Sequence, residues 1–189
     1  WWSYMAGRYP DQVGMLVGPS YANKNPIRPW FEFALDNGAF VAYRKKEEWD
    51  RSLWIDMLDM VRLLRRNPLW AVVPDVVGDK VATRKRWFAE SGVVQAKGWR
   101  TAFAVQDGMT PDDVPQNADV LFVGGTDAFK WRHLRMWTDN FPRVHVGRVN
   151  TMRHVHICED LGVESVDGTM WFRDPTRPSL IPALEEWFA

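Results

Sequence analysis

Short apolar runs recur along the chain, and most of them end in a polar residue followed by a glycine or another turn-forming residue. The runs are continuously apolar rather than alternating, which is typical of strands buried on both faces of a parallel sheet. They predict seven strands, at residues 13–17, 32–36, 69–73, 100–105, 119–123, 143–147 and 163–166.

Between these runs the apolar residues recur at helical spacing. The pattern is broadest over residues 47–64, and Asn67-Pro68 ends it. Residues 110–114 read as a helix start, with Thr110 as the cap and Asp113 reaching back to it. Residues 1–12 are predicted to be an irregular cap and residues 21–29 a loop. Further helices are predicted at residues 80–95, 127–139, 151–161 and 179–188.

Strands that alternate with helices predict an α/β fold whose parallel sheet is covered on both sides. Residues 1–189 are expected to form a single domain, and function concentrated at strand ends favours a compact (β/α)8 barrel of the TIM type. The chain is shorter than the usual barrel of about 250 residues, so a barrel lacking one unit is left open. The alternative is a doubly wound open sheet, but no GxGxxG turn follows the first strand.

The overall charge is balanced, with 24 basic and 24 acidic side chains. This argues against a protein held to nucleic acid by net charge alone, although it leaves room for a local basic face. Basic residues that follow strand ends are expected to rim the mouth of a site and to hold phosphates. They are Arg44, Lys45, Lys46, Lys130, Arg132 and Arg148.

Cysteine content and hydropathy exclude several classes of protein. The lone cysteine, Cys158, excludes an internal disulfide framework and a multi-cysteine zinc site. A metal site built from His145, His154, His156 and Cys158 is rejected, because His154 and His156 are two apart on a helix and diverge. We expect no metal and no cofactor. Neither a membrane span nor a signal-like start is visible, so we expect an intracellular protein.

Two aspartates are the main candidates for chemistry. Asp36 ends an apolar run before Asn37-Gly38, and Asp167 ends another before Gly168. In a barrel the second and last strands are near neighbours, so the two carboxylates can face one another. One can then attack an anomeric carbon while the other, with a raised pKa, handles the proton. Either residue alone is better read as a turn cap; the set favours function.

Three further strand ends carry groups suited to a planar base. Asp75 can accept two hydrogen bonds from an amidine-like edge such as guanine N1–H and its 2-amino group, and the Gln106 amide can read a carbonyl and a ring nitrogen. Gly124-Gly125 offers backbone N–H groups, or merely a tight turn. Asp79 is better read as a helix cap, and Asp107-Gly108 as a turn.

These strand-end motifs resemble those of the tRNA-guanine transglycosylases. Asp36-Asn37-Gly38-Ala39-Phe40 is similar to the Asp-Ser-Gly-Gly-Phe motif of that family. Later motifs follow in the family's order: Pro74-Asp75, Val105-Gln106-Asp107-Gly108, Gly124-Gly125 and Val166-Asp167-Gly168-Thr169. The residues at 144–150 and 165–169 are closer to the phage-borne branch, often called DpdA-like, which inserts 7-deazaguanines into DNA. The resemblance covers roughly residues 33–175.

The resemblance implies a role for each matched position. Asp167 would be the nucleophile on C1′ of the target nucleotide, and Asp36 the general acid/base. The purine would be held by Asp75, Gln106 and the Gly124-Gly125 backbone. Asn37 and Phe40 of the first motif, and Arg148 after the sixth strand, are expected to bind substrate as well. In the family reaction guanine is expelled, a covalent sugar–enzyme ester forms, and a 7-deazaguanine attacks it.

The resemblance also implies the partners. The target is DNA rather than tRNA, because the zinc subdomain of the tRNA enzymes is absent from this sequence. The small substrate is a 7-deazaguanine such as preQ0, 7-cyano-7-deazaguanine. The chain is short, so a second copy or a helper protein could supply further DNA surface. The expected location is the cytoplasm, that of the host if the gene is carried by a phage.

Two other functions stay open. One is an N-glycosidase that uses water at the same site. The other is a non-catalytic barrel that binds a purine or nucleotide, which the zero net charge mildly favours.

Overall fold

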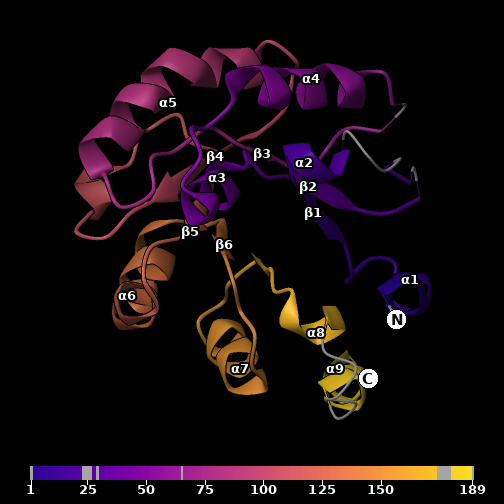
Figure 1. Ribbon diagram of the computed structural model, residues 1–189. Helices are drawn as coiled ribbons and strands as arrows, with labels where there is room; N and C mark the ends of the chain where they lie inside the picture. The colour runs from indigo at the N-terminus through magenta and orange to yellow at the C-terminus, as the bar shows by residue number, and fades with distance from the viewer. Residues whose placement is uncertain (1, 23–26, 29, 65, 174–179, 189) are drawn as a thin grey trace.

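The fold is organised around one curled parallel sheet, seen in a computed structural model that describes residues 2–22, 27–28, 30–64, 66–173 and 180–188 (Figure 1). The seven strands pair in the order in which they occur in the chain, and every pair is parallel. They are β1 (Met15–Val17), β2 (Phe33–Leu35), β3 (Ala71–Val72), β4 (Thr101–Val105), β5 (Val120–Val123), β6 (Val144–Val146) and β7 (Ser165–Val166). The sheet therefore forms about half of a barrel wall.

One helix, α1, precedes β1 and the others follow strands; α4, α5, α6 and α7 lie outside the curve of the sheet (Figure 1). They are α1 (Trp2–Arg8), α2 (Pro19–Ala22), α3 (Ala39–Lys45), α4 (Arg51–Arg62), α5 (Lys80–Gln95), the 3-10 helix η1 (Pro111–Asp113), α6 (Asp127–Asn140), α7 (Met152–Asp160), α8 (Met170–Arg173) and α9 (Leu180–Phe188). None of the helices in the described ranges has the length and apolar character to cross a membrane.

The prediction of a mixed α/β fold with seven parallel strands is confirmed. The alternative of a doubly wound open sheet is wrong, because that fold reverses its strand order at a switch point. Here the order runs from β1 to β7 without reversal.

The helix predictions hold where the apolar pattern is long and fail where it is short. α5 spans the predicted residues 80–95, and α4 starts at Arg51 because Asp50 caps it through the Ser52 and Leu53 amides. The irregular cap predicted at 1–12 is wrong, since residues 2–8 form α1. The loop predicted at 21–29 is partly wrong, since α2 includes residues 21–22; residues 23–26 and 29 lie outside the described ones, as does residue 179 of the last predicted helix.

Two apolar layers pack on the two faces of the sheet. The outer layer is large and packs the strands against the helices, with Trp54, Trp87 and Trp137 fully buried in it. The inner layer is small and faces the hollow side of the sheet. It comprises Ala34, Trp70, Val72, Ala102, Ala104 and Val120, with Leu16 and Phe122 packed against them. Because side chains alternate along a strand, the inner layer fixes which strand-end residues point the same way.

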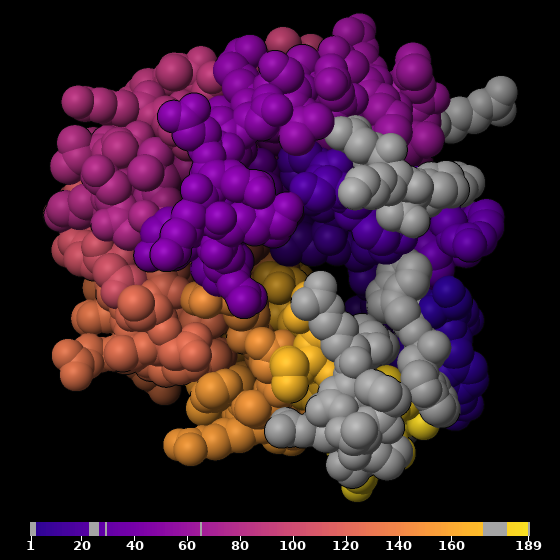
Figure 2. Space-filling model, viewed as in Figure 1, coloured from indigo at the N-terminus to yellow at the C-terminus, as the bar shows by residue number. Residues whose placement is uncertain are grey.

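The two end helices meet where the sheet is open. Among the described residues β1 pairs only with β2, and β7 only with β6. Beside this opening, α1 packs on α9: the Tyr4 hydroxyl donates to Glu185 Oε1 at 2.9 Å, and the rings of Tyr9 and Phe188 stack with centroids 4.8 Å apart. Figure 2 shows the indigo N-terminal helix against the yellow C-terminal one. Helix packing thus replaces strand pairing on this side.

The N-cap of α5 gives a test of the fold that leaves the strand-end carboxyls untouched. The Asp79 carboxylate accepts from the amides of Val81 and Ala82 at 3.0 and 2.9 Å, which confirms the capping reading. Asp79→Ala should lower the free energy of unfolding by about 1 kcal/mol, because two helix amides lose their acceptor. Urea titration followed by circular dichroism measures the change. Asp79→Asn keeps an acceptor and should stay within a few tenths of wild type; equal losses in both variants would contradict the capping role.

Candidate active site

Three of the predicted polar residues directly follow strands on the inner face of the sheet. Asp36 follows β2, Gln106 follows β4 and Asp167 follows β7. In β2 and β4 they continue the alternation of Ala34 and Ala104, both members of the inner layer. The carboxyl ends of parallel strands share one edge of the sheet, so the three side chains are delivered to a common region.

The pKa of Asp36 is raised to about 7. Burial is the largest cause, the negative charges of Asp75 and Asp167 add to it, and the hydrogen bonds from the backbone amides of Asn37 and Gly38 oppose it. Asp36 Oδ1 accepts from the Asn37 amide at 2.8 Å. A group with this pKa gains and loses a proton near neutral pH, as a general acid/base must.

Asp75 is held by a closed set of hydrogen bonds. Its Oδ1 accepts from Asn37 Nδ2 at 2.8 Å and its Oδ2 from Gln106 Nε2 at 2.7 Å. Arg86 donates to its backbone carbonyl at 2.9 Å. Burial raises the pKa of Asp75, and the Asn37 bond opposes that rise. Asn37 therefore links the first motif to the third strand end, which its sequence position alone did not indicate.

Gln106 is fixed at both ends of its amide. Its Oε1 accepts from the Gly78 amide at 2.9 Å while its Nε2 is bonded to Asp75. Asp75 and Gln106 are thus hydrogen-bonded to each other, and their binding of a base stays a prediction. Each carboxylate oxygen has a second lone pair, so a base can add hydrogen bonds to Asp75 without displacing those already made.

Asp167 accepts hydrogen bonds from the neighbouring strand β6 and from the segment that follows it. Its Oδ1 lies 3.3 Å from the Arg148 amide, and its Oδ2 lies 3.2 Å from His145 Nε2. A Cβ added to Gly147 would meet Asp167 Oδ2 at 3.3 Å and the Phe122 ring at 3.0 Å. The absence of a side chain at 147 therefore makes room for both groups.

His145 is the site residue that the sequence analysis missed. It was considered only as a metal ligand, yet it is buried and contacts Asp167 directly. A signal was present, because it is the one polar residue within the apolar run Val144-His145-Val146. A buried polar side chain requires a partner, and the partner here is a predicted catalytic residue.

Phe40, Arg148 and Gly125 form a second cluster beside the carboxyls. The Arg148 guanidinium lies 4.7 Å from the centroid of the Phe40 ring and also donates to the Gly125 carbonyl. Arg148 has a positive φ of 60°, which few side chains adopt. The cluster joins α3 to the ends of β5 and β6, so these predicted substrate-binding residues are brought together.

Gly125 has a steric requirement for glycine. Its φ is 76°, and an added Cβ would lie 2.3 Å from Asp107 Oδ1. The Asp107 carboxylate accepts from both the amide and the hydroxyl of Thr126 at 2.7 Å, which ties the end of β4 to the start of α6. Residues 107–108 form the predicted turn, with Gly108 at a positive φ of 77°. A Cβ at Gly124 would meet the Val105 carbonyl oxygen at 3.2 Å. The Gly-Gly pair thus lets the backbone pass close to the end of β4.

The predicted rim of basic residues is only partly correct. Lys130 is fully buried, donates to the Gly147 carbonyl at 2.6 Å and pairs with Asp127 at 3.2 Å, so it cannot hold a phosphate at the surface. Burial lowers its pKa. The prediction for Lys130 is wrong because this residue lies on the buried face of α6. Exposed cations do lie elsewhere: Arg44, Lys45, Lys46 and Arg132.

His154 and Cys158 are engaged in packing, whereas His156 is exposed and contacts Glu159. His154 stacks on Trp131 with centroids 3.9 Å apart. Burial raises the pKa of the Cys158 thiol to about 12, so the reactive thiolate is disfavoured. Over the described residues no group of three or more His, Cys, Asp and Glu side chains is arranged to hold a metal ion.

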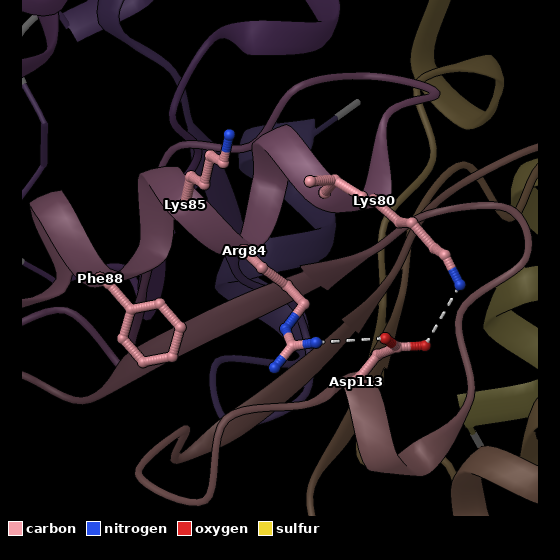
Figure 3. Close-up of a pocket in the computed structure, with 6 residues that line it drawn as sticks. Lys80, Arg84, Lys85, Phe88 and Asp113 are labelled. Atoms are coloured by element: carbon pink, nitrogen blue, oxygen red, sulfur yellow. Dashed lines mark hydrogen bonds and ion pairs between the residues drawn. The ribbon is translucent and has the colours of Figure 1, made fainter.

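A surface depression of about 230 Å³ lies between α5 and η1 (Figure 3). Asp113 pairs there with Lys80 and Arg84 at 3.7 and 3.4 Å. None of the three strand-end aspartates lines it. Three cations, Lys80, Arg84 and Lys85, line it with one carboxylate, Asp113, so its lining carries a net positive charge. The strand-end cluster, where the predicted site residues meet, remains the candidate site.

No protein-family model matches the chain, and no curated protein matches it either. The strand-end residues and their motifs are therefore the basis for assigning a class of function.

The coupling around Asp36 predicts a pH-dependent stability. The folded pKa of about 7 exceeds the unfolded value of about 3.9, so the stability contributed by protonated Asp36 is lost as pH rises from about 4 through 7. Asp36→Asn removes this loss and should be more stable than wild type at pH 8, by about 1–4 kcal/mol, and similar at pH 4. Urea unfolding at several pH values measures the difference.

The matched control is Asp112→Asn, which changes an exposed aspartate in η1. Its stability curve should run parallel to that of wild type across this pH range. A parallel curve for Asp36→Asn as well would show that the pKa of Asp36 is not raised in the folded protein.

Proposed function

We propose that this protein is a base-exchanging glycosyltransferase that replaces guanine in DNA with a 7-deazaguanine. The observation that carries the proposal is the coupling of Asp36 to Asp75 and Asp167, which helps raise the Asp36 pKa to about 7. Three aspartates distant in the sequence lie within electrostatic reach of one another. Their motifs resemble those of tRNA-guanine transglycosylases, and the half-barrel sheet fits a TIM-type barrel reduced by one unit.

Asp36 and Asp167 have different roles in the reaction. Asp167 attacks C1′, so that a carboxylate–sugar bond forms as the bond from C1′ to guanine N9 breaks. The electron pair goes to the departing base, and protonated Asp36 supplies the proton. In the second step a 7-deazaguanine gives its N9 proton to Asp36 and its N9 attacks C1′, which releases Asp167. Two inversions retain the configuration at the sugar.

Asp75 and Gln106 hold the base in both steps. Guanine and 7-deazaguanine present the same N1–H, 2-amino and O6 edge, so one set of contacts serves the leaving and the incoming base. The fixed Asn37–Asp75–Gln106 chain supports this use, because the recognising groups are already oriented before a base arrives. The Phe40–Arg148 pair beside them offers a planar surface and a cation to the nucleotide.

DNA is the favoured macromolecular substrate. The residues at 144–150 and 165–169, which are closer to the phage-borne branch that acts on DNA, support this choice. Exposed Arg44, Lys45 and Lys46 end α3, whose first residue follows Gly38 of the first motif. These cations can contact phosphates while the target base leaves the stack to reach the carboxyls.

Replacing the nucleophile tests the proposal directly. Asp167→Asn should abolish the covalent protein–DNA complex, because an amide cannot displace a base from C1′. Incubation of the protein with guanine-containing DNA, followed by denaturing gel electrophoresis, detects the complex. Asp160→Asn, an exposed aspartate on α7, is the matched control and should behave as wild type. A covalent complex that survives Asp167→Asn would contradict the assigned nucleophile.

Exchange and hydrolysis are separated by the need for the incoming base. With DNA labelled in guanine, release of label should require 7-cyano-7-deazaguanine and be accompanied by its incorporation. Release without the deazaguanine would show an N-glycosidase that uses water. Binding of a purine with neither release nor a covalent complex would show a non-catalytic protein.

A further inference from the structure

We propose that His145 is a positioning residue that holds one oxygen of the Asp167 carboxylate and leaves the other to attack the sugar. The inference rests on the proposed function, in which Asp167 is the nucleophile. His145 lies on β6 and Asp167 directly after β7, and the two neighbouring strands place His145 Nε2 3.2 Å from Asp167 Oδ2.

The imidazole is packed against two aromatic rings. It is only 3% exposed, and its ring centroid lies 4.8 Å from those of Trp70 and Phe122. Trp70 belongs to the inner layer, Phe122 packs against that layer, and the two rings contact each other edge to face at 6.1 Å. This packing favours the ring orientation in which Nε2 faces Asp167.

The second ring nitrogen selects the tautomer. His145 Nδ1 lies 2.8 Å from Ser165 Oγ, on the strand that leads to Asp167. A carboxylate only accepts hydrogen bonds, so Nε2 carries the proton that faces Asp167, and Nδ1 of the neutral ring accepts from the Ser165 hydroxyl. The hydrogen bonds thus run in one direction, from the Ser165 hydroxyl to His145 Nδ1 and from His145 Nε2 to Asp167.

This arrangement distinguishes the two carboxylate oxygens. Oδ2 accepts from His145 and lies beside Gly147, whereas among the described residues the hydrogen bond to Oδ1 comes from the Arg148 amide at 3.3 Å. We therefore assign Oδ1 as the attacking atom. When the ester forms, Oδ2 becomes its carbonyl oxygen and still accepts from Nε2–H, so the bond persists through both displacements.

The alternative is a buried histidine whose partners merely satisfy it. The two roles differ in what a substitution changes. A structural histidine would affect stability and base binding together. A positioning histidine would slow the formation of the covalent complex while the base site at Asp75 and Gln106, which uses other strands, keeps its affinity.

The test is His145→Phe, which keeps a ring packed on Trp70 and Phe122 and removes both nitrogens. The single-turnover rate of covalent complex formation should fall on the order of 100-fold, because the nucleophile loses its orientation. The Kd for 7-cyano-7-deazaguanine should stay within about twofold of wild type if base binding is independent. His145→Gln, which restores a donor, should recover part of the rate. An unchanged rate, or equal losses in rate and affinity, would overturn the inference.

His154→Phe is the matched control, because it makes the same change in a ring that stacks on Trp131. It should leave the rate unchanged. Ser165→Ala is the second variant if His145→Phe does not fold. It should slow complex formation by less than His145→Phe, because the ring keeps its aromatic packing but loses its tautomer partner; a wild-type rate would contradict this direction of the hydrogen bonds.

An NMR measurement, which does not depend on the reaction, distinguishes failure of this inference from failure of the proposed function. The ¹⁵N spectrum of the folded protein should show His145 with its proton on Nε2, and Asp167→Ala should shift that resonance. A proton on Nδ1 alone would overturn the inference, whatever the DNA assays show. Absence of a covalent complex with wild-type protein, together with the expected spectrum, would instead overturn the proposed function.

Discussion

The structure depends on the removal of several like charges from water at one edge of a parallel sheet. Asp36 is the clearest case, since burial and two neighbouring carboxyls oppose its ionised form. Such an arrangement costs stability, and it persists because the neighbours are tied down: Asp75 by Asn37 and Gln106, and Asp167 by His145 and the Arg148 amide. A cluster of carboxyls whose mutual repulsion and burial raise a pKa is characteristic of functional sites.

The positions of Asp36, Gln106 and Asp167 are set by the strands that they directly follow. Alternation along β2, β4 and β7 places the residue after each strand on the inner face, and the strand order brings the ends to one edge. The outer layer of large apolar residues then holds the strands in register from the other side. The inner layer can therefore be small and partly polar without loss of the fold.

The sequence contained most of the architecture, because continuous apolar runs and long helical patterns are local signals. It also indicated that Asp36, Asp75, Gln106 and Asp167 belong together, since each ends a run. It could not indicate partners. The bond from Asn37 to Asp75 spans 38 positions, and the contact of His145 with Asp167 depends on strand neighbours. Lys130 was placed wrongly because a helix start does not reveal which face is buried. The short helices α1, α2 and α3 have too few turns to show a period.

The contact of His145 with Asp167 bears on the order of events at the sugar. The imidazole packs on Trp70 and Phe122 on the inner side of the sheet and contacts the carboxyl assigned as nucleophile. If bases are exchanged through an ester on Asp167, both purines bond to C1′ from the same face. The outgoing purine must then depart before its replacement attacks, which is a ping-pong sequence, and the sugar ester must outlast the interval between them.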